Sequence, residues 1–189
     1  MVLSLMIWIW ILIIALISLL VIIAIYYYNR FITLENRIEN SEAQIDVQLK
    51  KRADLVPNLV KVVKGYVKHE TAIFDKITKV RAGLMKSEDL AGKIKAGDML
   101  QQFLGRLIAI AESNPELKAN ENFLQLQQEL SAIEDKVAYA RQYYNDSVMD
   151  YENASERFPG VFFFKLYGRT KKQFLIIQES ERKMPEIEL

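Results

Sequence analysis

The first 28 residues form one apolar stretch, which only Ser4 and Ser18 interrupt, and the first charged side chain is Arg30. About 20 such residues are enough for a helix to cross a bilayer. A cleavable signal peptide instead has a basic start, an apolar run of about 7–15 residues and a small-residue cleavage site. Because none of these three features is present, we predict an uncleaved transmembrane anchor over residues 1–28.

Aromatic and basic residues at the ends of this stretch predict how it lies in a membrane. Trp8 and Trp10 lie near one end and the tyrosines of residues 26–28 at the other, as in the aromatic belts at the two bilayer interfaces. Lysine and arginine favour the cytoplasmic side, and Arg30 and Arg37 follow the span. We therefore expect a single-pass protein of the cell membrane with its N-terminus outside and its C-terminal domain in the cytoplasm.

Apolar residues then recur at helical spacing along residues 29–84. A second apolar track lies four residues beyond the first, and two such tracks form one helix face that needs partners. If the helix is unbroken, it is a rod about 84 Å long at 1.5 Å per residue. The first track advances in steps of seven through Phe31, Ile38, Ile45, Arg52, Leu59, Tyr66, Ile73 and Val80.

A turn and a second helical region follow. Residues 85–97 lose the rhythm and contain two glycines, which predicts the turn, and Asp98 is a candidate cap for the next helix. Residues 98–157 are again periodic in steps of three and four, which predicts amphipathic helix. The Phe-Pro-Gly sequence that starts at Phe158 ends this region.

The dipeptide Asn114-Pro115 leaves two arrangements open, because asparagine can cap a helix and proline suits its first position. If the chain only bends there, residues 98–157 form an arm of about 90 Å that pairs with the first in an antiparallel hairpin. If the chain reverses there, the helices pack as a three- or four-helix bundle. In both cases we expect an all-α fold, with a transmembrane helix followed by a long, antiparallel, coiled-coil-like bundle over residues 29–159.

The remaining residues, 160–189, form an aromatic and basic tail. Four aromatics within seven residues precede a basic cluster at Lys171 and Lys172. Such a segment suits contact with a membrane interface or docking onto a neighbouring subunit. Alternatively, the phenylalanines at 162–164 cover the open end of the bundle core. We expect the tail to pack on the bundle or on the membrane.

Arg52 falls on the first apolar track, where leucine or isoleucine is expected. One hypothesis is that its guanidinium meets Glu121 or Glu129 on the partner helix and so locks the register. The alternative is a side chain that extends to solvent without a fixed partner.

Pro57 lies within the same periodic region and costs a helix roughly 3 kcal/mol, because it removes one backbone hydrogen bond. It frees the carbonyl of Ala53, and the short polar side chains nearby, Asp54 and Asn58, are able to bond loose backbone groups. Asp54 could instead cap a restarted helix. Because the apolar track continues in phase to Tyr66, we predict one bent but continuous helix.

Composition narrows the classes of function. The net charge is +1 and belongs wholly to residues 30–189, so we expect no nucleic-acid partner. The absence of cysteine suits either compartment. With His69 as the only histidine, a metal site would consist almost wholly of carboxylates. Neither a nucleophilic-serine motif nor a phosphate loop is present, and we expect no catalytic activity and no cofactor.

Three long segments resemble the LemA family: "RADLVPNLV", "NPELKANENF" and "ARQYYND". The resemblance covers nearly the whole chain from the anchor to Pro159. It implies a membrane-anchored helical bundle that faces the cytoplasm, and it implies no reaction. The sequence departs from the family at Asn114, where an aromatic residue is frequent, and in the many phenylalanines after Pro159.

Two functions from different classes remain. The first is a membrane-anchored scaffold that self-assembles at the bilayer, and the alternative is a membrane-tethered adaptor or signalling protein that binds a protein partner through its bundle. The expected partners are the lipid bilayer, further copies of the chain and, for the adaptor, another protein. The candidate interaction residues are Arg52, Asp54, Pro57, Asn58, Tyr66, Glu121, Tyr144, Phe158, Pro159, Phe162, Phe163 and Phe164.

Overall fold

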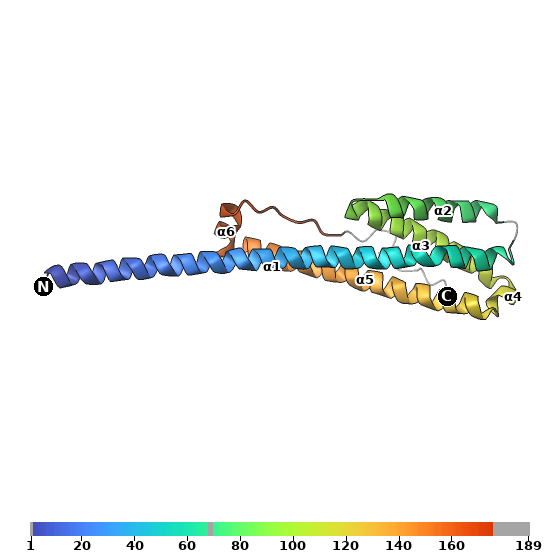
Figure 1. The fold of residues 1–189 in the computed structure, drawn as a ribbon, viewed down its shortest axis with the longest axis horizontal. Helices are drawn as coiled ribbons and strands as arrows, with labels where there is room; N and C mark the ends of the chain where they lie inside the picture. Colours follow the sequence, from blue (N-terminus) through green and yellow to red (C-terminus); the bar gives the residue numbers. More distant parts are fainter. Residues whose placement is uncertain (1, 68–69, 176–189) are drawn as a thin grey trace, which may run out of the picture. The chain divides into compact units, whose positions relative to one another are not determined.

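The computed structural model describes residues 2–67 and 70–175, which form helices and no strand, as predicted for an all-α protein (Figure 1). His69 lies outside the described residues. The helices within these ranges are α1 (Val2–Lys64), α2 (Thr71–Lys86), α3 (Leu90–Glu112), α4 (Pro115–Lys118), α5 (Glu121–Glu156) and α6 (Gly160–Leu166).

Contacts divide the chain into two units, and each is described by itself. Among the described residues, the bundle unit contains 40–67, 70–144 and 175, and the aromatic unit contains 2–39 and 145–174. The predicted domain boundaries after residues 28 and 159 stay predictions.

The bundle unit is a helical bundle in which successive helices run in opposite directions. Lys64 near the end of its α1 segment lies over Phe74 near the start of α2, at 5.1 Å from the ring centroid. The α3 helix packs beside α2, as Figure 1 shows. Gln127 Nε2 of α5 donates to Glu112 Oε1 at the end of α3 at 3.0 Å. The chain therefore reverses around α4, which decides for the bundle over the long hairpin.

The apolar face that the sequence predicts for α1 is buried in the core of this unit. The α1 side chains are buried together with apolar residues of α2, α3, α4 and α5, so one chain covers most of its own periodic stripe. The buried apolar residues include Ile45, Leu49, Val56, Leu59, Val63, Phe74, Ile77, Leu84, Leu100, Leu104, Leu107, Leu117, Phe123, Leu130 and Val137.

The predicted rod over residues 29–84 is wrong, because α1 ends at Lys64 and α2 begins at Thr71. The turn after α1 is closed by the amide groups of Tyr66 and Val67, which donate to Val63 O at 3.0 and 2.9 Å. The physical reason for the error is that α2 has the same apolar period as α1. A reversal that lays α2 against α1 buries both faces, and periodicity alone does not reveal it.

The predicted turn over residues 85–97 is also wrong in extent. The α3 helix begins at Leu90, and Asp89, not Asp98, caps it by accepting from Gly92 N at 2.9 Å. A Cβ at Gly97 would lie 2.7 Å from Leu49 Cδ2, so this glycine allows close approach of α3 to α1 within a helix.

The second predicted break is correct. Asn114 caps α4 by accepting from Glu116 N at 3.1 Å, and Pro115 occupies the first turn of that helix. The tail differs from the expected irregular end, because it contains the short helix α6.

Candidate membrane-interface site

An aromatic cluster in the aromatic unit packs α6 against α1 and α5. Phe163 stacks on Tyr27 with 5.3 Å between ring centroids, and Phe164 meets Phe31 edge-on at 5.7 Å. Tyr151 of α5 closes the cluster at 5.8 Å from Phe164. Aromatic pairs at such separations contribute about 0.5–1.5 kcal/mol each beyond the area that they bury. Phe163 and Phe164 thus act as packing residues.

A polar network holds the segment that follows α6. Arg169 forms an ion pair with Glu35, and Tyr151 Oη lies 3.0 Å from Glu35 Oε1 and 3.1 Å from Thr170 O. Burial, together with the hydrogen bond to Glu35, raises the pKa of Tyr151. Lys171 Nζ pairs with Glu156 Oε1 at 2.5 Å, which raises the lysine pKa. The basic part of the tail is therefore tied to carboxylates of α1 and α5.

Three other apolar side chains of this segment point outward. Phe158, Phe162 and Leu166 are 80%, 65% and 72% exposed, and they are spaced four residues apart. We call them the exposed stripe. A Cβ at Gly160 would overlap Ala154 O, so the chain passes closely over the end of α5 where α6 begins. Three exposed apolar residues on one face are a surface that needs a partner.

The exposed stripe belongs to a segment that contacts the end of the apolar stretch of α1. Tyr167 Oη donates to Ala24 O at 2.7 Å, and Tyr28 meets Tyr167 edge-on at 5.4 Å between centroids. The apolar stretch begins near the N-terminus, is fully exposed over its most apolar window and is long enough to cross a membrane. Aromatic residues at the end of such a stretch are typical of a membrane interface.

Arg52 lies in the bundle unit and is only 1% exposed. Its Nη1 donates to Gly97 O at 3.4 Å and to Gln101 Oε1 at 3.3 Å, both on α3. The predicted pairing with Glu121 or Glu129 is therefore wrong, and so is the solvent-reaching alternative. The α1 face that carries Arg52 packs against α3, whereas Glu121 and Glu129 lie on α5.

Electrostatics around Arg52 involve both signs of charge. Burial lowers its pKa, and the carboxylates of Glu134 and Asp98 oppose this effect while Arg141 reinforces it. Asp98 forms an ion pair with Arg141, and Gln101 donates to Glu134, so the polar groups of α3 and α5 form one network beside Arg52. The other terminal nitrogen of Arg52, Nη2, has no hydrogen-bond partner within the described chain.

The remaining candidates of the bundle unit are scattered. Asp54 is exposed and pairs with Lys50 at 3.2 Å. Tyr66 accepts a hydrogen bond from Asn120 Nδ2 at 3.1 Å, and this links the turns before α2 and α5. Asn58 and Glu121 are exposed, whereas Tyr144 is buried, and burial raises its pKa. The structure does not bring these residues together into one site, and their roles stay predictions.

Pro57 lies inside α1, which continues through it as predicted. The carbonyl of Ala53, which has lost its usual partner, accepts from Arg81 Nε of α2 at 2.7 Å. Because α1 is continuous through Pro57, the alternative that Asp54 caps a restarted helix is wrong. Pro57 leaves the carbonyl of Ala53 without its partner within α1, and Arg81 of α2 donates to it instead.

Arg81→Met is expected to cost about 1–3 kcal/mol of unfolding free energy, because it leaves the buried carbonyl of Ala53 unpaired. In a Pro57→Ala background the restored amide takes this carbonyl, so the same change should cost at least about 1 kcal/mol less. Both changes in unfolding free energy are measured by chemical denaturation of the full-length protein in detergent, monitored by circular dichroism. Lys79→Met on the exposed face of α2 is the control, and equal costs of Arg81→Met in both backgrounds would contradict the coupling.

The sequence predicts the aromatic segment but not its division into packed and exposed members. The four-residue spacing of Phe162 and Leu166 was a usable signal for one helix face, whereas Phe158 precedes α6. No local sequence pattern predicts the ion pair between Glu35 and Arg169, because the two residues are far apart along the chain. Among the described residues, no group of three or more histidine, aspartate or glutamate side chains is placed to hold a metal ion.

Comparison with known proteins identifies the family. Residues 41–189 match the LemA family. Magnetosome protein MamQ 1 of Paramagnetospirillum magneticum is 26% identical, with 78% of this chain and 64% of that protein covered. Magnetosome protein MamQ of Magnetospirillum gryphiswaldense is 25% identical at the same coverage.

Protein LemA of Metamycoplasma hominis is 26% identical, with 65% of this chain and 59% of that protein covered. The chain therefore spans somewhat less than two thirds of the length of these relatives. Because the family match extends over most of the sequence, the chain belongs to the LemA family.

Proposed function

We propose that this protein is a membrane-anchored helical scaffold that self-assembles at the bilayer and has no catalytic activity. One observation carries the proposal: α1 runs without interruption from Val2 to Lys64. Residues of the exposed apolar stretch and core residues such as Leu59 therefore belong to a single helix. A scaffold needs such a continuous chain connection between its anchor and the part that it presents.

The same observation disfavours the tethered adaptor. A tether that lets a binding domain search for partners is usually rich in glycine, serine or proline. Residues 29–56, which follow the aromatic end of the anchor, contain no glycine and no proline and are helical throughout. The relatives named as magnetosome proteins are compatible with a structural role.

The cytoplasmic placement of the bundle gains support from basic residues near the end of the span. In addition to Arg30 and Arg37, Lys165 of α6 and Arg169 shortly after it are basic, and Tyr167 between them contacts α1 at Ala24. An excess of arginine and lysine beside a span favours the cytoplasmic side. We therefore propose that the N-terminus lies outside the cell.

Self-assembly needs surfaces that the bundle leaves exposed. Because the apolar stripe of α1 is buried within its own bundle, the scaffold needs other contacts between copies. The anchor helix is one, and exposed apolar residues of the bundle such as Val47 and Leu124 are others. Weak contacts that repeat between many copies are enough for assembly on a membrane, since confinement raises the effective concentration.

The full-length protein, reconstituted in liposomes and crosslinked there, is expected to give species larger than one 22.0 kDa chain. Their proportion should rise with the protein-to-lipid ratio, as mass action requires. Mass photometry of the detergent-solubilised protein gives the second measurement. A strict monomer in both settings would contradict self-assembly, and a stoichiometric foreign partner crosslinked in intact cells would favour the adaptor.

A further inference from the structure

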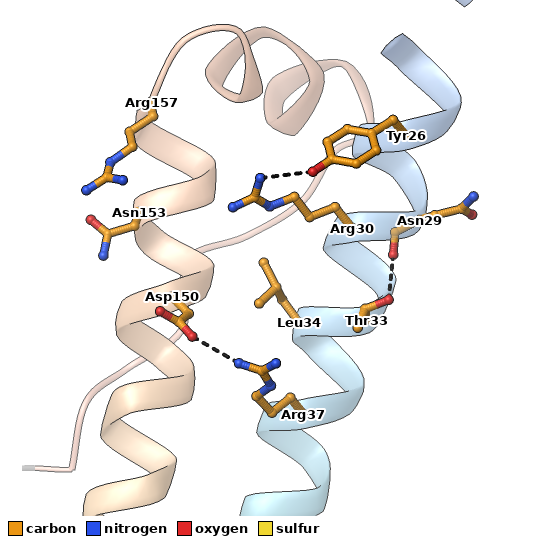
Figure 2. A pocket seen from close by; sticks show the side chains of 9 residues that line it. All are labelled: Tyr26, Asn29, Arg30, Thr33, Leu34, Arg37, Asp150, Asn153 and Arg157. Carbon is orange, nitrogen blue, oxygen red and sulfur yellow. Dashed lines mark hydrogen bonds and ion pairs between the residues drawn. The ribbon is translucent and has the colours of Figure 1, made fainter. Parts of the chain in front are cut away.

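A polar groove opens between α1 and α5 within the aromatic unit. It has a volume of about 580 Å³ and lies beside the end of the apolar stretch. Leu34, which is buried, forms an apolar patch in the wall. The groove is lined by Tyr26, Asn29, Arg30, Thr33, Leu34, Arg37, Asp150, Asn153 and Arg157 (Figure 2).

The charges of the groove are unbalanced. Figure 2 shows Arg30 and Arg37 extending from α1 toward α5, and Arg37 pairs with Asp150 at 3.0 Å. Arg30 Nη1 donates only to the hydroxyl of Tyr26, at 3.3 Å. Within the described ranges, neither Arg30 nor Arg157 forms an ion pair. Three arginines and one aspartate leave a formal charge of +2 in the groove.

This arrangement suits a phosphate group. A guanidinium presents a planar fork of donors that matches the oxygens of phosphate, and such charge-assisted hydrogen bonds are about twice as strong as neutral ones. The amides of Asn29 and Asn153 and the hydroxyl of Tyr26 add neutral donors. A phosphate bound in the groove would offset the surplus positive charge of Arg30 and Arg157, which both line it.

The position of the groove along α1 indicates that the phosphate belongs to a lipid headgroup. Arg30 follows the last aromatic residue of the apolar stretch by two positions, which is about 3 Å along a helix. If the stretch crosses a bilayer, as proposed above, the groove lies at the level of the lipid headgroups. Anionic lipids there attract basic side chains next to a span.

We infer that this groove binds the phosphate headgroup of an anionic phospholipid, with Arg30 and Arg157 as the two phosphate-binding side chains. The ion pair between Arg37 and Asp150 bounds the groove on the side away from the membrane.

Native mass spectrometry of the full-length protein in detergent, with phosphatidylglycerol and phosphatidylcholine of matched acyl chains, tests the inference. The wild type should retain phosphatidylglycerol about tenfold better than phosphatidylcholine, since about 1.4 kcal/mol accounts for a factor of ten. The double variant Arg30→Gln with Arg157→Gln should lose this preference. The control, Arg106→Gln with Lys86→Gln, removes the same charge from exposed positions outside the groove and should keep it.

Three outcomes would overturn the inference. One is equal retention of the two lipids by the wild type, and another is an equal loss of preference in the control variant. The third is full displacement of phosphatidylglycerol by millimolar inorganic phosphate, which would make the groove a site for free phosphate.

The inference rests on the proposed membrane anchor but fails separately from the proposed scaffold. Loss of lipid preference with crosslinked assembly intact overturns the groove alone, and a monomer that retains phosphatidylglycerol overturns the assembly alone.

Discussion

Arg52→Ala is expected to lower the free energy of unfolding by about 3–5 kcal/mol. The side chain is fully buried, so alanine leaves a large cavity and removes the positive charge next to Glu134 and Asp98. Arg52→Met fills nearly the same volume without a charge, and it should cost about 1 kcal/mol or less. Both free energies come from chemical denaturation of the full-length protein in detergent, measured by circular dichroism.

The reason for the small effect of methionine lies in the poor hydrogen bonding of Arg52. Its two bonds are long, at 3.3 and 3.4 Å, and Nη2 has no partner within the described residues. The desolvation of the guanidinium is therefore only partly offset. If Arg52→Met destabilised as much as Arg52→Ala, the polar contacts with α3, and not the volume of the side chain, would hold the two helices together.

Phe162→Trp is expected to place an indole in the membrane interface. Burial of a phenylalanine contributes about 1.5–3 kcal/mol, which corresponds to an inserted fraction of about nine tenths or more. In a background in which Trp8 and Trp10 are replaced by phenylalanine, the emission should shift to the blue. Lipids with a quencher close to the headgroup should quench it strongly in liposomes.

Tyr139→Trp is the matched control for this experiment. Tyr139 is 69% exposed, close to the 65% of Phe162, but it lies on α5 in the bundle unit. Its indole should emit at long wavelength and be quenched by aqueous iodide instead of by lipid. Equal lipid quenching at both positions, or none at either, would contradict membrane contact by the exposed stripe.

Much of the fold follows from periodicity alone. Three local signals predict helices that the structure contains. They are the apolar stretch of membrane-spanning length, the amphipathic repeat through Pro57, and the helix start at Asn114-Pro115. The helix through Pro57 was predictable because the repeat keeps its phase on both sides. The end of α1 was not, since α2 continues the same repeat after the chain has reversed.

Tertiary structure decided which groups meet. The order and register in which the helices of the bundle unit pack decide these contacts. They determine that Arg81 donates to the carbonyl of Ala53 and that Arg52 faces α3 instead of α5. Local spacing does not specify register between helices, because many alignments bury the same apolar faces.

Tertiary packing also decides which residues of the aromatic segment are packed and which are exposed. Periodicity places Phe162 and Phe163 on different faces of one short helix, but only the contact of Phe163 with Tyr27 determines which face is covered. The groove that brings Arg30 and Arg157 to one surface arises because α1 and α5 run side by side. The sequence by itself therefore determined the helical periodicity and an apolar stretch long enough to cross a membrane, since these depend on neighbours along the chain. The tertiary structure decided the polar partners, the exposed stripe and the groove, since these depend on residues that are distant in sequence.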